Sequence, residues 1–269
     1  MTYFKAPPDW DEKQPNPFMP DGSYGPEWSC LRMLDADDDI ILNGTGDNGL
    51  YRFLAGRKVE NLETKLADFL RYENAHGRKV IVSFPPDIAA DELVNRALAS
   101  VSNTSTIRPD DPRWIVHSTS LEAWERIRTC GELRSLARLR GEGIDARGVG
   151  LSEFREPDDY AEYVMLCRYD HIAAEHVVAS QVAGRVITEE DTPYEPGVRL
   201  YFDARRIILD GLAVRDGLHI LKVHDHLPLE RYLVATISVE DIDPRGEVSV
   251  WTPRTFLDRA NEWFTFIGG

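Results

Sequence analysis

The sequence predicts a protein of the α+β class, in which a smaller α/β region precedes a larger, strand-rich domain. Helical periodicity dominates the earlier half of the chain, whereas short apolar and β-branched runs dominate the later half. The chain has 269 residues, of which 42% are hydrophobic, so it is long and apolar enough to bury a large core. No internal repeat is visible.

Residues 1–107 divide into an extended arm, 1–28, and an α/β region, 29–107. The arm is rich in proline and lacks periodicity, and its aromatic side chains predict that it packs onto the body. In the α/β region we expect strands at 40–42, 50–53 and 79–84, and helices from 62 to the stop at Gly77 and at 91–99. The polar, proline-containing stretch 102–112 separates this region from the rest of the chain.

Residues 108–269 form the predicted larger domain. Its first strand, 113–117, leads into a helix at 121–129, where Thr119 and Glu122 have capping-box spacing and Gly131 is the stop. We expect further strands at 148–151, 198–202, 220–223 and 232–239, and a helix at 157–168.

Charge and cysteine content narrow the possible functions. A net charge of −15 disfavours a duplex nucleic-acid binder, which normally carries a basic surface. Cys30, Cys130 and Cys167 have no CxxC spacing, so we expect neither a disulfide framework nor a metal site, and a cytoplasmic location. No apolar run approaches the roughly 20 residues that span a bilayer, and we expect no signal peptide and no membrane partner.

One glycine-rich motif suggests nucleotide binding but is better explained as a turn. Residues 44–49 match the G-x-G-x-x-G pattern of dinucleotide-binding proteins. Asp47 would oppose a pyrophosphate, however, and Asn48 with Gly49 is typical of a hairpin turn before another strand. We therefore favour a hairpin.

Two histidine pairs suggest metal binding only weakly. His171 and His176 are five residues apart, so they do not share a helix face as metalloprotease ligands do. His224 and His226 could hold a metal if they lay on one strand, but the Leu-Pro that follows indicates a turn. We favour structural roles for both pairs.

A run of arginines also has two explanations. It could bind a phosphate-bearing ligand, or it could be a solvated helix face that balances the acidic surface, which we favour. The run consists of Arg126, Arg128, Arg134, Arg138 and Arg140.

The most chemically capable segment is 114–120, a strand that ends on His117, Ser118 and Thr119 before a helix begins. Polar groups at a strand end have a rigid base, and small-molecule sites are often built there. Periodicity alone would explain these residues as a buried histidine and a helix cap. The order of the segments that follow favours a binding site.

That order resembles the ADP-ribosyltransferase superfamily, in the branch of the diphtheria-toxin-like polymerases, the DarT-type DNA-modifying toxins and the RNA 2′-phosphotransferases. Those proteins open with a strand ending in His-x-Thr and a helix that reaches a glycine, then a Gly-rich strand and an Ala-x-Tyr element. The similar segments here are 114–119 with the helix to Gly131, 148–152, 159–163, 200–204, 210–212 and 227–232. They cover about half of the chain, from about 113 to 240.

The resemblance implies an ADP-ribosyltransferase-like split β-sheet and a toxin-like transferase, a glycosyltransferase that uses NAD as substrate. It implies that His117 donates to a ribose hydroxyl and that Ser118 or Thr119 bonds the nicotinamide carboxamide. Tyr163, with Tyr160 behind it, would stack on the nicotinamide. The candidate carboxylates that stabilise the cation formed as nicotinamide leaves are Glu230 and Glu153.

The chain departs from the family at two positions, and two alternatives therefore stay open. Gly150 stands where the polymerases carry a tyrosine, and Ile220 stands nearest the DarT glutamate. One alternative is an NAD-dependent RNA 2′-phosphotransferase, which needs arginines aimed at phosphate, such as Arg113, Arg138 or Arg147. The other is a non-catalytic acidic interaction protein with a degenerate nucleotide cleft. The expected acceptor is a protein, an RNA or a small molecule.

Overall fold

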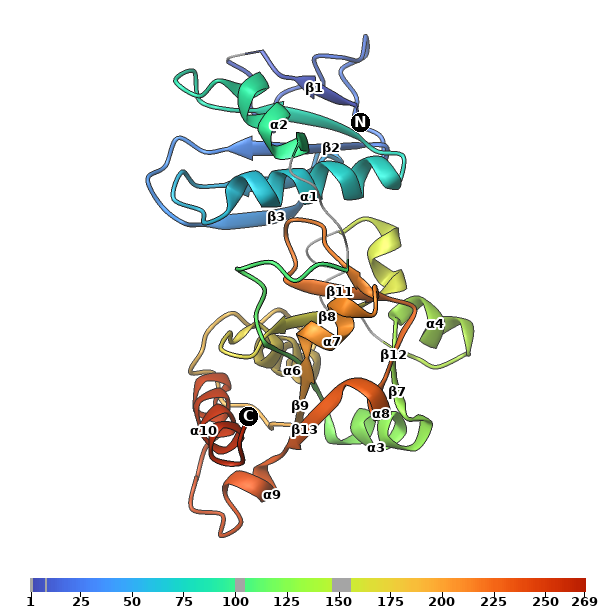
Figure 1. Ribbon diagram of the computed structural model, residues 1–269, viewed down its shortest axis with the longest axis vertical. Helices are drawn as coiled ribbons and strands as arrows, with labels where there is room; N and C mark the ends of the chain where they lie inside the picture. The colour runs from blue at the N-terminus through green and yellow to red at the C-terminus, as the bar shows by residue number, and fades with distance from the viewer. Residues whose placement is uncertain (1, 8, 100–104, 147–155) are drawn as a thin grey trace. The chain divides into compact units, whose positions relative to one another are not determined.

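The computed structural model describes residues 2–7, 9–99, 105–146 and 156–269 (Figure 1). The chain forms two compact units and has the mixed α+β character that the sequence predicts. The first unit contains Met1–Asn103, Phe154–Tyr160 and Arg215–His219, and the second contains Thr104–Glu153, Ala161–Val214 and Ile220–Gly269. The first unit thus includes two short segments from the part of the sequence that predicts the larger domain.

The first unit is built on one mixed sheet. Its strands, in spatial order, are β1 (Tyr3–Lys5), β5 (Lys79–Ser83), β2 (Trp28–Met33), β4 (Tyr51–Ala55) and β3 (Ile41–Thr45). The first four run parallel, and β3 is antiparallel to β4. Because β1 belongs to the arm, the arm is part of the sheet, and Phe4 packs edge-on against Trp28 with ring centroids 5.1 Å apart.

The helices and the hairpin of the first unit follow local signals. The helices are α1 (Leu62–Ala75) and α2 (Ala90–Ala99). Gly77 follows α1 with a φ of 78°, a conformation that glycine adopts without strain. The predicted hairpin is confirmed, because β3 turns through Gly46–Gly49 into β4. A strand rather than a helix follows the G-x-G-x-x-G motif, so the motif is not a dinucleotide-binding turn.

The second unit has a six-stranded antiparallel sheet and a two-stranded one. The order of the large sheet is β10 (Ala213–Val214), β11 (Leu221–His224), β8 (Tyr163–Arg168), β6 (Trp114–Thr119), β9 (Val198–Asp203) and β13 (Leu233–Ile237). The small sheet pairs β12 (His226–Pro228) with β7 (Glu132–Arg134). In Figure 1, β8 and β11 lie together, and β9 lies beside β13.

Helices cover both faces of the large sheet. Those described are α3 (Leu121–Cys130), α4 (Leu136–Gly141), α6 (Ala173–Ala183), α7 (Ala204–Leu209), α8 (Leu229–Tyr232), α9 (Val239–Ile242) and α10 (Pro253–Phe266). Side chains of α6 and α10 pack with Val116 and Tyr201 on one face. Ile115, Leu200 and Phe202 pack with α7 on the other face. Within the described ranges, none of the helices is both long and apolar enough to cross a membrane.

The predicted helix at 157–168 is wrong. A single 3-10 turn, Asp158–Glu162, precedes β8, whose residues pair with β11 on one side and β6 on the other. The acidic first turn is a local helix signal, but burial between two strands decides the structure of the following six residues. This is a tertiary effect, which periodicity in one segment does not reveal.

Two further expectations need smaller corrections. The helix cap is Ser120, whose side chain accepts from the Ala123 N–H at 3.2 Å, and not Thr119, which still pairs with Val198 in the sheet. The strand expected at 232–239 covers Leu233–Ile237 because short helices flank it. The strand expected at 148–151 lies outside the described residues.

Candidate functional site

The large sheet opens between β6 and β8, beginning at His117. Along its whole length β6 pairs with β9, from Trp114 to Thr119. Both β6 and β8 are fully described, yet the register that joins them covers two pairs, Ile115 with Arg168 and Val116 with Cys167. The other end of β8 pairs instead with β11. His117 therefore occupies the first position of β6 beyond the paired part of the two strands.

The ring of His117 bridges the opening. Its Nδ1 lies 3.3 Å from the backbone oxygen of Met165 on β8. A carbonyl oxygen only accepts hydrogen bonds, so Nδ1 carries the proton in this contact. Burial lowers the pKa of His117, and the hydrogen bond to Met165 opposes this only in part. The imidazole is thus neutral at pH 7, and its Nε2 is a hydrogen-bond acceptor.

Ser118 points to the opposite face of β6 from His117, because successive side chains of a strand alternate. Its hydroxyl donates to Glu175 Oε1 at 2.5 Å, inside the core between β6, α6 and β9. Arg199 Nη1 donates to the same carboxylate oxygen at 2.6 Å. The Ser118 hydroxyl therefore has a buried protein partner, and in this arrangement it does not face the opening.

Thr119 lies on the same face of β6 as His117, at the last position of the strand. Its backbone is held very close to Gly197, where a Cβ would come within 1.8 Å of the Thr119 carbonyl oxygen. Of the two hydroxyl residues that the resemblance implies, Thr119 is the one that alternation puts on the His117 side.

Tyr163 begins β8, two residues before Met165, and is partly exposed. The Lys222 ammonium lies over its ring, 4.6 Å from the centroid, and the His224 ring meets it edge-on with centroids 5.4 Å apart. Both contacts come from β11, which pairs with the edge of β8 away from β6. Tyr163 shares its face of β8 with Cys167, which pairs with Val116, so alternation puts its side chain on the opposite face of the sheet from His117.

Tyr160 belongs to the first unit, whereas the other described candidates belong to the second. It is almost fully buried, and its ring contacts Tyr51, Tyr72 and His219 with centroids 5.5 to 5.7 Å apart. Burial raises its pKa well above the ordinary value. Because its ring surface is used in this packing, the structure does not bring Tyr160 together with His117 as a stacking residue.

Of the two candidate carboxylates, the structure describes Glu230 alone. Glu230 is exposed on α8, which packs against β7 and β12. Across the described ranges, no hydrogen bond or ion pair links Glu230 to His117. Glu153 lies outside the described residues.

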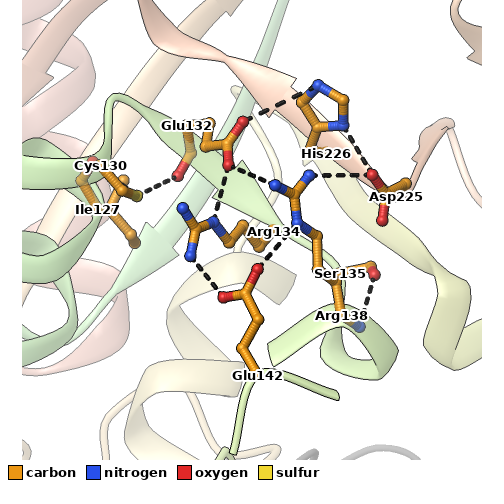
Figure 2. A network of polar contacts seen from close by, with 9 residues as sticks. All are labelled: Ile127, Cys130, Glu132, Arg134, Ser135, Arg138, Glu142, Asp225 and His226. Atoms are coloured by element: carbon orange, nitrogen blue, oxygen red, sulfur yellow. Dashed lines mark hydrogen bonds and ion pairs between the residues drawn. The ribbon is translucent and has the colours of Figure 1, made fainter. Parts of the chain in front are cut away.

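Four of the five arginines of the basic run bind carboxylates, and Figure 2 shows two of them, Arg134 and Arg138. Glu132 Oε1 accepts from Arg134 at 2.8 Å and from Arg138 at 3.0 Å. Glu142 also pairs with both arginines, and Asp225 accepts from Arg138 at 2.9 Å. The network holds α4 against β7 and the turn before β12.

Three more arginines in the described part of the chain have protein partners. Arg126 and Arg128 pair with glutamates on their own helix. Arg113, one candidate phosphate ligand, stacks on the Trp114 ring with a distance of 4.4 Å to the centroid. Arg147 lies outside the described residues. These contacts match a charge-balanced surface better than a phosphate site.

The turn expected after His224 is confirmed. Asp225 has a φ of 64° and separates β11 from β12, so the two histidines do not share one strand. His226 Nδ1 lies 2.8 Å from Asp225 Oδ2. In the parts of the chain that the structure describes, no group of three or more His, Cys, Asp or Glu side chains is arranged to hold a metal.

Sequence reasoning missed Glu175, Arg199 and Lys222, which are fully buried near the opening. A signal was present for two of them. Arg199 and Lys222 each interrupt a short apolar run that predicts a strand, and a charge inside a buried strand requires a partner. The partners lie far along the chain, so the sequence does not reveal them.

Comparison with known proteins does not identify a family for this chain. No family model matches the chain, and neither a curated protein nor a solved structure is similar to it. The resemblance to the ADP-ribosyltransferases therefore stays a proposal.

Proposed function

We propose that the second unit binds NAD where β6 and β8 separate, and that it transfers ADP-ribose from NAD to an acceptor. The observation that supports this most is the position of His117, the first residue of β6 beyond its pairing with β8. A split sheet is the architecture that the resemblance implies. The order of segments from 113 to 240 supports the same assignment.

The neutral His117 binds NAD as an acceptor. Since Nδ1 donates to Met165, a ribose hydroxyl donates to Nε2, which reverses the direction expected from the sequence. Thr119, on the same side of β6, is the hydroxyl that remains for the nicotinamide carboxamide. Tyr163 does not complete this arrangement, because alternation puts its side chain on the opposite face of the sheet from His117 and Thr119.

The transfer itself replaces one bond at the ribose C1′. The glycosidic bond to nicotinamide breaks, and nicotinamide leaves with the bonding pair. A nucleophile of the acceptor then bonds to C1′ and loses its proton. A carboxylate stabilises the positive charge that develops on the ribose, and the two candidates are Glu230 and Glu153.

A thermal-shift titration with NAD tests the binding site. At 100 times its dissociation constant a ligand stabilises a protein by about 2.7 kcal/mol, so the wild type will unfold at a higher temperature. His117→Ala will lose this shift, whereas the control His171→Ala, which removes an exposed histidine at the start of α6, will keep it. The NAD assignment fails if the wild type shows no shift or if His117→Ala retains it in full.

Release of nicotinamide tests the transfer. Glu230→Gln and Glu153→Gln keep the side-chain shape and remove the charge. We expect one of them to slow nicotinamide release by about 100-fold or more while NAD still binds. If both variants release nicotinamide at the wild-type rate, neither carboxylate is catalytic and the proposed chemistry is wrong.

A further inference from the structure

Glu175 is the centre of a buried polar network beside His117. Its carboxylate accepts from Ser118 Oγ at 2.5 Å, from Arg199 Nη1 at 2.6 Å and from the Tyr194 hydroxyl at 2.8 Å. Glu175 and Arg199 are both 0% exposed. The three donors come from β6, from β9 and from the chain just before β9, whereas Glu175 comes from α6.

Arg199 extends the network to the chain that follows β8. Its Nη2 donates to the backbone oxygen of Tyr169 at 2.6 Å, and the Asn261 side chain of α10 donates to the same oxygen at 2.9 Å. One connected set of bonds therefore joins β6 and its neighbour β9 to the segment leaving β8, next to the end of β8 that is paired with β6.

Stability alone does not account for such a network. A buried ion pair seldom stabilises a protein more than well-packed apolar side chains would. A buried polar network does select one arrangement of the strands and helices that contribute to it. In this network the Arg199 Nε is the buried atom left without a hydrogen-bond partner among the described residues. The network is thus suited to holding a nearby group in one position.

That nearby group is His117. It precedes Ser118, and the two side chains lie on opposite faces of β6, so anchoring Ser118 fixes the rotation of the strand. The contact from His117 Nδ1 to Met165 is 3.3 Å, at the long end of the hydrogen-bond range. A small rotation of β6 would break it and would let either imidazole nitrogen carry the proton.

We propose that Glu175 is a positioning residue that acts through Ser118 to keep His117 in its Nδ1–H form, with Nε2 as the acceptor. The structural part of this inference stands on the hydrogen bonds alone, and its use in NAD binding rests on the proposed function. Ser118 then contributes to the site indirectly and does not touch the ligand.

The test compares two buried serines. Ser118→Ala removes the link to Glu175. Ser180→Ala is the matched control, because Ser180 is a buried residue of α6 that bonds His176 and Ile187. The readout is the tautomer of His117, from the ¹⁵N chemical shifts of its imidazole. We expect the Nδ1–H form in the wild type and in Ser180→Ala, and a mixture of tautomers in Ser118→Ala.

Further variants keep the test decisive. Ser118→Thr restores a hydroxyl and should restore the Nδ1–H form. Tyr194→Phe removes a different donor to Glu175 and should shift the tautomer equilibrium of His117 partly in the same direction. This variant replaces Ser118→Ala in the test if Ser118→Ala does not fold. An unchanged tautomer in every foldable variant overturns the inference, as does an equal change in Ser180→Ala.

A second readout separates this inference from the proposed function. In Ser118→Ala the dissociation constant of NAD should rise about tenfold, the loss expected for one weakened hydrogen bond. If the wild type binds no NAD, the proposed function fails, and the tautomer measurement still decides whether Glu175 positions His117. If NAD binds equally to both proteins while the tautomer changes, the role of positioning in binding is wrong.

Discussion

Arg78 and Asp159, which lie 81 residues apart in the chain, form a part-buried ion pair in the first unit, with Nη1 2.6 Å from Oδ1. Arg78 also donates to the buried Glu73 through Nε and Nη2, at 2.7 and 2.9 Å. The Tyr72 hydroxyl donates to Asp159 at 2.6 Å. The core of the first unit is therefore completed by a segment from far along the sequence.

Replacing Arg78 by alanine should destabilise the first unit strongly. Glu73 is fully buried and would lose the cation that compensates its charge, a change that costs about 3–5 kcal/mol. Arg96→Ala is the control, because its pair with Glu63 is exposed to solvent and contributes little to stability. Chemical denaturation of both variants measures the difference, and equal losses would show that Arg78 is not important for the fold.

A fragment of residues 2–99 should not fold cooperatively. It lacks Tyr160, whose buried ring packs between Tyr51 and Tyr72. It also lacks Gly217, which approaches the backbone of Lys65 so closely that a Cβ would lie 2.1 Å from the Lys65 oxygen. We expect poor dispersion in its ¹H–¹⁵N spectrum. A well-dispersed spectrum with a cooperative thermal transition would contradict this.

The stability of the first unit should fall between pH 6.5 and pH 9. Burial lowers the pKa of His219, but the charge of Asp216 and hydrogen bonds to Asp216 and Glu156 outweigh burial and raise the pKa to about 9. Because the folded pKa is above the unfolded value of about 6.5, the stabilisation is complete below pH 6.5 and is lost as the pH rises through 9. The free energy of unfolding that is lost over this pH range is of the order of 3 kcal/mol.

Denaturation curves measured across this pH range check the assignment. His219→Gln should be less stable at pH 6 and should show a flatter pH profile than the wild type. His224→Gln, which alters an exposed histidine, should keep the wild-type profile. If His219→Gln kept the wild-type profile, the ion pairs of His219 would not be the cause of the pH dependence.

Gly197→Ala should destabilise the second unit. The new Cβ would lie 1.8 Å from the Thr119 oxygen, so β6 and the chain before β9 must move apart, at a cost of about 2–3 kcal/mol. Gly141→Ala is the matched control, because a Cβ there meets nothing within 4 Å. Thermal unfolding of the two variants is the measurement, and a wild-type transition in Gly197→Ala would show that the strands separate more easily than their geometry indicates.

NAD binding should weaken at acid pH if His117 is the acceptor. Burial lowers the pKa of His117, so affinity should be constant above the ordinary histidine value of about 6.5 and should fall as the pH drops through the lower folded value. Calorimetric titrations from pH 5 to pH 8 measure this. His117→Asn keeps an acceptor that does not titrate, so any binding it retains should not depend on pH.

Elements with local signals were predicted well. The strand at 79–84, the hairpin at 44–49 and the helix that ends at Gly131 depend on residues within a few positions of one another. Apolar periodicity, a tight-turn dipeptide and a glycine stop are each readable in a short window. The sequence likewise predicted a strand at 113–117, and the structure extends it to Thr119 because β9 pairs with the two following residues.

The site could be predicted only in part, because its contacts join distant residues. The Ser118 hydroxyl donates to Glu175, which lies 57 residues away. Because no nearby residue indicated this partner, the sequence interpretation assigned the hydroxyl to a ligand. Tyr160 and Tyr163 are close in sequence, yet they belong to different units.

The sequence by itself determined where most strands and helices lie and that His117 belongs to a strand beside two hydroxyl residues. Only the tertiary structure decided that β8 is a strand, that Ser118 faces the core and that the sheet opens at His117. The physical reason is that strand pairing and buried charge networks depend on partners far along the chain. Local sequence propensity does not reveal those partners. Contacts with them decide which side chains of a strand face the core.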